Sequence, residues 1–149
     1  MMSDEIGADT ARKILESYRT FAVVGCSPNP ERASHSVARF LKGRGYRVIP
    51  VHPTADRILD LPCYPDLGSI PAAEGVEVVD IFRRSDLAGV HVDEAITMRA
   101  RAVWMQLGVI DAAAAERARA AGLDVMMDQC PAIEYRRLYG TGEGPPFTP

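Results

Sequence analysis

The sequence predicts a three-layer α/β domain, in which helices cover both faces of a five-stranded parallel sheet. Two observations lead to this prediction. The chain of 149 residues alternates short, continuous apolar runs with segments of helical spacing, and continuous runs are typical of strands buried on both faces. The segments between the runs are long enough for the crossovers that parallel strands require. With 47% hydrophobic residues, the chain can bury one core.

The first third of the chain predicts a helix followed by one strand–helix–strand unit. We expect Asp9 to cap a helix that ends near Tyr18. Residues 21–24 form the first strand, which leads into a turn at residues 25–33. Ser34 is the expected N-cap of the next helix, which ends near two glycines at positions 43 and 45. The second strand then covers residues 46–51.

The rest of the chain predicts three more strands and three more helices. Residues 52–73 are rich in proline and polar side chains, which predicts an extended loop with one or two short turns. Asp86 and Asp111 are expected N-caps, and Pro131 is expected at the first position of the last helix. The expected strands are residues 76–82, 102–106 and 123–127, and the expected helices are residues 86–99, 111–122 and 131–138.

This alternation is typical of a Rossmann-type domain, for which we predict the strand order 3-2-1-4-5. Ligands of such sheets lie at the carboxyl ends of the strands where the order reverses, here between the first and fourth strands. The length fits a single domain, residues 1–149, with loosely packed tails at residues 1–8 and 140–149.

Composition and charge exclude several classes of function. The net charge of -3 gives no basic excess that would attract nucleic acid. The N-terminus lacks the basic start and apolar run of a secretory signal, and no apolar stretch has the length of a membrane span. The cysteines, Cys26, Cys63 and Cys130, are odd in number and widely spaced, as expected of reduced thiols. We therefore expect a cytoplasmic protein with neither a membrane nor a nucleic-acid partner.

The turn after the first strand is the first candidate site. It holds a single glycine, Gly25, so it lacks the G-x-G-x-x-G fingerprint of dinucleotide-binding proteins. The turn precedes a predicted helix, whose free amides and positive dipole end favour an anion. We predict that the turn contacts phosphate, with Cys26 as its small residue. The side chains that can add donors are Ser27, Asn29, Arg32, Ser34 and Ser36.

The end of the second strand carries His52 in place of an acidic residue. Proteins that bind NAD carry an acid near this point, which accepts hydrogen bonds from the ribose hydroxyls. The nearby Arg57 suits an additional ribose phosphate, as in coenzyme A or NADP, better than a bare diol. The alternative interpretation of His52 is a packed loop residue.

Two later strand ends add further candidates. Arg83 and Arg84 follow the third strand, and adjacent side chains point in different directions. We expect Arg83 to face the ligand and Arg84 to pair with Asp86. At the end of the fourth strand, Gln106 is placed to bond an amide or ribose of the ligand.

Six ordered blocks resemble the small bacterial and archaeal CoA-binding domain proteins. They cover nearly the whole chain, and the same fold forms the N-terminal domain of the succinyl-CoA synthetase alpha subunit. His52 departs from the pattern, in which we expect asparagine. The blocks are residues 23–34, 45–53, 63–67, 79–83, 103–109 and 127–131.

The resemblance implies that the chain binds coenzyme A or an acyl-CoA as a stand-alone module. It places the cofactor's phosphates at the turn after the first strand, with the segments at His52 and Arg83 lining the same crevice. An acyl-CoA enzyme or a second copy of the chain are the protein partners that we consider. The synthetase carries its phosphoryl group on a histidine of a separate domain, so its ligase activity does not follow from the resemblance.

The residues do not predict catalysis or a metal site. Cys130 precedes a predicted helix, which can lower the pKa of a thiol, but the sequence places no histidine near it as a base. Two alternatives stay open. One is an oxidoreductase that binds NAD(P), with Arg57 or Arg83 on the additional phosphate of NADP. The other is a redox-responsive interaction protein in which Cys26 or Cys130 takes up a thiol.

Overall fold

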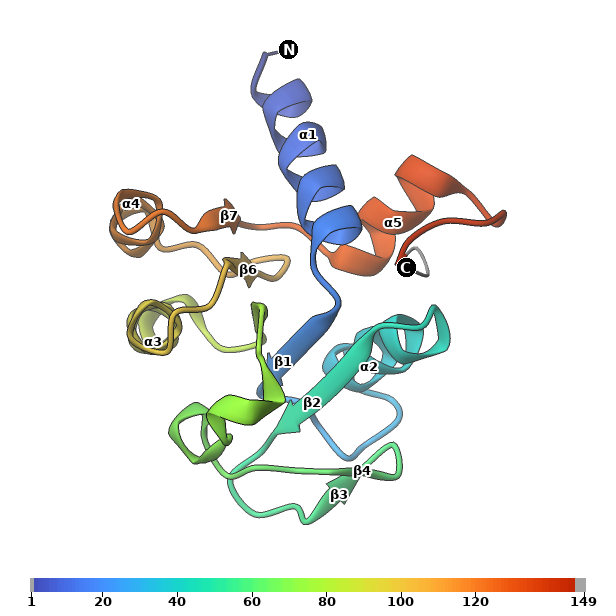
Figure 1. The fold of residues 1–149 in the computed structure, drawn as a ribbon, viewed down its shortest axis with the longest axis vertical. Coiled ribbons are helices and arrows are strands. Elements are labelled where there is room, and N and C mark those ends of the chain that lie inside the picture. Colours follow the sequence, from blue (N-terminus) through green and yellow to red (C-terminus); the bar gives the residue numbers. More distant parts are fainter. Residues whose placement is uncertain (1, 147–149) are drawn as a thin grey trace.

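A computed structural model describes residues 2–146, and it contains one five-stranded parallel sheet (Figure 1). The strands lie in the order β2-β1-β5-β6-β7. Every neighbouring pair is parallel, and the register of the first pair aligns Phe21 of β1 with Val48 of β2. The strands are β1 (Thr20–Val24), β2 (Arg47–Val51), β5 (Val78–Ile81), β6 (Ala102–Met105) and β7 (Asp124–Met126).

Helices cover both faces of this sheet, as the sequence predicted. Side chains of α1, α2 and α5 pack on one face around Phe21 and Trp104. Side chains of α3 and α4 pack on the other face around Ile81 and Met105. The three-layer Rossmann-type α/β fold is therefore confirmed. The helices are α1 (Met2–Ser17), α2 (Ala33–Gly43), α3 (Ser85–Thr97), α4 (Ala112–Ala120) and α5 (Pro131–Tyr139). None of them is long and apolar enough to cross a membrane.

The predicted strand order 3-2-1-4-5 requires one correction. The third long strand, β5, pairs with β1 and not with β2, so the order of the five strands by sequence is 2-1-3-4-5 and β2 lies at the edge. Pro50 within β2 has no backbone N–H, and prolines in sheets are confined mainly to edge strands. On its outer side β2 meets the segment at Tyr64, whose N–H donates to the carbonyl oxygen of Pro50 at 3.1 Å.

The segment between β2 and β5 is more regular than the extended loop that the sequence predicted. A short antiparallel hairpin comes first, and two 3-10 turns follow it. The first turn begins at Asp66, whose carboxylate accepts a hydrogen bond from the Ser69 amide at 2.8 Å. These elements are β3 (Arg57–Ile58), β4 (Leu61–Pro62), η1 (Leu67–Ser69) and η2 (Ala72–Glu74).

The helix starts agree with the sequence at two of five positions. Asp111 caps α4, accepting a hydrogen bond from the Ala114 amide at 3.0 Å, and Pro131 is the first residue of α5. The other three predicted caps lie inside their helices. α1 begins at Met2, so Asp9 is internal, and the N-caps of α2 and α3 are the residues before Ala33 and Ser85.

The C-terminal tail is exposed at residues 140–143, whereas Pro145 is buried and hydrogen bonds connect the tail to two helices. The hydroxyl of Tyr135 in α5 donates to the Pro145 carbonyl at 2.6 Å and accepts from Arg44 at 2.9 Å. Arg44 also donates to the Gly142 carbonyl at 2.9 Å. α5 and the end of α2 thus hold the tail, whereas residues 147–149 lie outside the described part.

Candidate functional site

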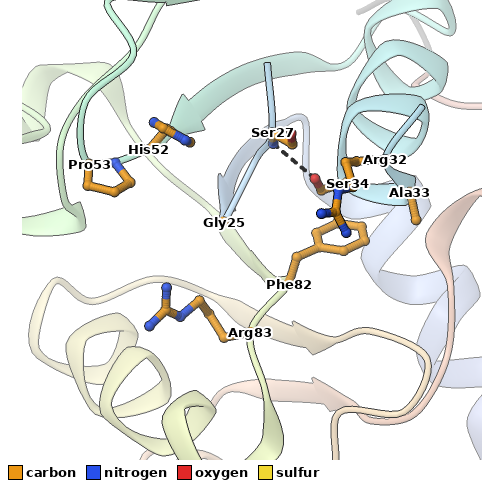
Figure 2. A pocket seen from close by; sticks show the side chains of 9 residues that line it. All are labelled: Gly25, Ser27, Arg32, Ala33, Ser34, His52, Pro53, Phe82 and Arg83. Carbon is orange, nitrogen blue, oxygen red and sulfur yellow. Dashed lines mark hydrogen bonds between the residues drawn. The ribbon is translucent and has the colours of Figure 1, made fainter. Parts of the chain in front are cut away.

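A cavity of about 490 Å³ lies at the carboxyl ends of β1, β2 and β5, beside the start of α2 (Figure 2). In this view His52 and Arg83 lie on one side of the opening, with Arg32 and Ser34 on the other. The structure therefore brings six of the predicted site residues to one place. The full lining is Gly25, Ser27, Arg32, Ala33, Ser34, His52, Pro53, Phe82 and Arg83.

Gly25 brings the turn after β1 against the end of β5. Its φ of +77° favours glycine, and a Cβ placed there would lie 2.2 Å from the Phe82 carbonyl oxygen. The same Cβ position is 3.5 Å from the Cδ atom of Arg83, so the stem of that arginine lies beside the turn. The Gly25 amide donates to the Val51 carbonyl at 3.1 Å, which fastens the turn to the end of β2.

Two residues in the first turn of α2 contact the backbone amide and the backbone carbonyl of Ser27. The Ser34 hydroxyl accepts a hydrogen bond from the Ser27 amide at 2.9 Å, and Nδ1 of His35 lies 2.9 Å from the Ser27 carbonyl oxygen. Ser34 therefore acts through its hydroxyl on the loop, and not as the predicted N-cap. His35 was not a predicted site residue. It is buried within α2, and the sequence contains no feature that indicates its contact with Ser27.

The cavity favours an anion. The N-cap of α2 is Arg32, which makes no side-chain cap hydrogen bond, so the first amides of this helix have no capping acceptor. Positive dipole charge at this end adds to the guanidinium groups of Arg32 and Arg83. Among the side chains that the structure describes, residues 7–146, neither arginine forms a salt bridge, and the cavity lining includes no acidic side chain. A phosphate here would meet backbone donors and two cations.

His52 lines the cavity and also shapes its own loop. Its Nδ1 atom accepts hydrogen bonds from the amides of Thr54 at 3.2 Å and Ala55 at 3.0 Å. A nitrogen that accepts carries no proton, so in the neutral ring the proton is on Nε2. His52 therefore shapes its own loop with Nδ1, and Nε2 has no hydrogen-bond partner among the described residues.

The other predicted residues, Ser36 among them, do not line this cavity. Cys26 is fully buried and packs into the core, and Gln106 is buried at the end of β6. Asn29 shapes the loop, because its side-chain oxygen accepts from the Glu31 amide at 3.0 Å. Arg57 is exposed on β3 and donates to the Asp60 carbonyl. Arg84 pairs with Asp86 as predicted, at 2.9 Å.

A buried carboxylate, Asp80, lies next to the site and was not predicted from the sequence. It is fully buried in β5, and its Oδ1 atom accepts a hydrogen bond from Nε2 of Gln106 at 2.5 Å. Oδ2 is also buried and has no hydrogen-bond partner among the described residues. Burial raises the pKa of Asp80 to about 7, although the bond from Gln106 acts in the opposite direction. The sequence feature that could have indicated Asp80 is an acidic residue inside an otherwise apolar strand.

The cysteine thiols are poorly placed to react. Burial raises the pKa of Cys26 to about 12, and it also raises the pKa of Cys130 despite backbone amides at the start of α5. The thiolate is the reactive form, so both environments disfavour it. Among the described side chains, those of residues 7–146, no three histidine, cysteine or acidic groups are arranged to hold a metal ion.

Comparison with known proteins identifies the family. The family model described as "CoA binding domain" matches residues 19–136, which include every residue that lines the cavity. The chain belongs to the CoA-binding domain family. The Bacillus subtilis (strain 168) protein YneT is similar, with 35% identity over 119 residues, which cover 80% of this chain and 87% of YneT.

Solved structures support the same fold. A protein from Pyrococcus horikoshii OT3 is 37% identical with a TM-score of 0.83, covering 89% of this chain and 92% of that one. The dinucleotide-forming acetyl-coenzyme A synthetase 1 of Ca. Korarchaeum cryptofilum has a TM-score of 0.67 at 23% identity. That match covers 78% of this chain but 27% of the synthetase, so the same fold also occurs within a much longer enzyme.

Proposed function

We propose that this chain binds coenzyme A or an acyl-CoA as a stand-alone module, with the phosphates of the ligand in the cavity at Gly25. One observation carries the proposal. The uncapped start of α2 and the guanidinium groups of Arg32 and Arg83 line a single cavity at the carboxyl end of the sheet. Membership in the CoA-binding domain family supports coenzyme A as the phosphate-bearing ligand.

The same cavity favours coenzyme A over NAD. An NAD site needs a carboxylate that accepts hydrogen bonds from the ribose diol, and the lining contains none. It offers donors instead: the Nε2 proton of His52 and the two arginines. These groups suit the ribose phosphate and pyrophosphate of coenzyme A.

Calorimetric titration tests the ligand. Coenzyme A, dephospho-coenzyme A, NAD and NADP are titrated in turn into the purified chain. We expect coenzyme A to bind most tightly, and removal of its 3′-phosphate to weaken binding. Tighter binding of either dinucleotide would instead support the oxidoreductase alternative. Absence of coenzyme A binding would overturn the proposal.

Arginine substitutions test the place of binding. Arg83→Gln removes a cation that lines the cavity, whereas Arg57→Gln removes an exposed cation that does not. A charge-assisted hydrogen bond is worth about 1.5–3 kcal/mol, so we expect roughly 10- to 100-fold weaker coenzyme A binding for Arg83→Gln. Arg57→Gln should bind like the unaltered protein. Equal losses in both variants would show that only long-range charge matters.

A further inference from the structure

The loop between β1 and α2 uses most of its own amides internally. The Ser27 amide donates to the Ser34 hydroxyl at 2.9 Å, as Figure 2 shows. The Asn29 amide donates to the Ser27 hydroxyl at 3.0 Å, and the Glu31 amide donates to the Asn29 side-chain oxygen at 3.0 Å. The Arg32 amide donates to the Asn29 carbonyl at 3.1 Å. These amides already have acceptors, so a phosphate in the adjoining cavity needs other backbone donors.

The amides without an acceptor lie at the start of α2. Ser36 is the first residue of this helix whose amide has an acceptor, the Arg32 carbonyl at 3.1 Å. Among the described residues, the amides of Ala33 and Ser34 have none, because Arg32 provides no side-chain cap. Both residues line the cavity. Binding of a phosphate there therefore depends on these two amides staying uncapped.

A backbone acceptor, the carbonyl oxygen of Ser27, also lies at the first turn of α2. Nδ1 of His35 lies 2.9 Å from this oxygen. A carbonyl oxygen only accepts, so Nδ1 of His35 carries a proton and donates it to the hydrogen bond. His35 is 7% exposed, and water is therefore largely excluded from this contact. The His35 ring thus engages an oxygen that would otherwise be available to cap the helix.

We propose that His35 is a positioning residue, which holds the Ser27 carbonyl away from the free amides of α2 and so keeps the phosphate position open. This inference rests on the proposed function, which places the phosphates of the ligand in the cavity at these amides. Without the His35 donor, the Ser27 carbonyl and the first amides of α2 would be neighbouring groups that each lack a partner. Unpaired polar groups with little access to water are costly, so the two would pair and close the site.

Substitutions at position 35 separate the hydrogen bond from packing. His35→Leu removes the donor, whereas His35→Asn keeps an amide N–H close to the place of Nδ1. His91→Leu is the matched control, because Nδ1 of His91 also contacts an oxygen, that of Glu94 at 2.7 Å, but this pair lies on α3 and does not line the cavity. Coenzyme A and inorganic pyrophosphate are titrated calorimetrically into the full chain and into each variant.

We expect His35→Leu to weaken the binding of coenzyme A and of pyrophosphate by about tenfold, which corresponds to one hydrogen bond. His35→Asn should restore most of the affinity, and His91→Leu should leave both affinities unchanged. Pyrophosphate carries phosphates alone, so equal losses for the two ligands place the effect at the phosphate position. His35→Phe, which keeps a ring but lacks the donor, takes the place of His35→Leu if thermal unfolding shows that His35→Leu does not fold.

Amide hydrogen exchange without ligand, followed by NMR, gives a readout that a merely structural role would not move. The Ala33 and Ser34 amides should exchange rapidly in the unaltered protein and slowly in His35→Leu, where the Ser27 carbonyl caps them. The role of His35 is overturned by equal exchange in the two proteins, or by unchanged affinity in a folded variant without the donor. A loss in His35→Asn or His91→Leu as large as that in His35→Leu also overturns it.

The proposed function can fail independently of this role. If the unaltered protein binds neither coenzyme A nor pyrophosphate, the proposed function is wrong. The exchange comparison needs no ligand, so it still decides whether His35 keeps the first amides of α2 uncapped.

Discussion

At the scale of single residues, Gly25 determines how closely the turn after β1 approaches β5. A Cβ at this position would lie 2.2 Å from a backbone oxygen, whereas a Cβ at Gly108 would meet nothing within 4 Å. Both glycines have positive φ, +77° and +79°. Gly108→Ala therefore carries only the conformational cost of about 1–2 kcal/mol, and Gly25→Ala adds a steric clash.

We expect Gly25→Ala to lower the free energy of unfolding by at least about 2 kcal/mol more than Gly108→Ala does. Chemical denaturation of both variants measures the difference. Equal losses would mean that the turn moves away from Phe82 at no cost, and that Gly25 does not fix the cavity.

Asp80 makes stability depend on pH. Its pKa is about 7 in the folded protein and 3.8 in its ordinary state, so between these values the folded protein holds a proton that the unfolded chain has lost. The free energy of unfolding therefore falls as the pH rises through this window, by at most about 1.4 kcal/mol per pH unit, and levels off above it.

Asp80→Asn should remove this component of the pH profile. Unfolding curves across the window are expected to show the variant gaining stability relative to the unaltered protein as the pH rises. Asp60→Asn, at an exposed position, controls for the loss of a charge. Parallel profiles for Asp80→Asn and the unaltered protein would contradict the raised pKa.

Several residues that line the candidate cavity could be predicted from the sequence, because their positions along the chain indicate them. Gly25, Ser34 and Arg83 follow predicted strands or open a predicted helix, and parallel strand ends meet at one edge of a sheet. Cys26 and Gln106 were expected at the same site but are buried. The sequence reports the order of residues along the chain, whereas the side to which each side chain turns depends on the packing around it.

At the scale of elements, the Tyr135 hydroxyl connects α5 to the C-terminal tail. The Tyr135 hydroxyl bonds both Arg44 and the Pro145 carbonyl, whereas the buried Tyr139 hydroxyl has no hydrogen-bond partner among the described residues. These two tyrosines of one helix differ in what their hydroxyls contact.

Tyr135→Phe should therefore cost about 1–3 kcal/mol in the free energy of unfolding, since it removes the donor to the buried Pro145 carbonyl and the acceptor for Arg44. Tyr139→Phe should be close to neutral. Thermal unfolding compares the pair, and a loss for Tyr139→Phe as large as that for Tyr135→Phe would refute this description of the tail.

The number and type of the long elements followed from the sequence, but their order in the sheet did not. Continuous apolar runs and helical spacing are local signals, whereas strand order depends on which edge a long connection reaches. The signal that was missed is Pro50, which marks β2 as an edge strand. With β2 at the edge, β5 pairs with β1, and the order reverses beside the turn at Gly25.

At the scale of the whole molecule, the chain is an acidic protein with one locally basic cavity. The net charge is -3, yet the cavity combines two arginines with the positive end of α2. Three strand ends and one helix start, separated along the sequence, supply its lining. An anion is therefore attracted to this place by local geometry and not by the overall charge.

The most direct test of the central claim is a crystal structure of the chain with coenzyme A. The account predicts phosphate oxygens within hydrogen-bond distance of the first amides of α2, and of the Arg83 guanidinium. The contradicting result is a coenzyme A molecule whose phosphates lie elsewhere, with the cavity at Gly25 holding none of them.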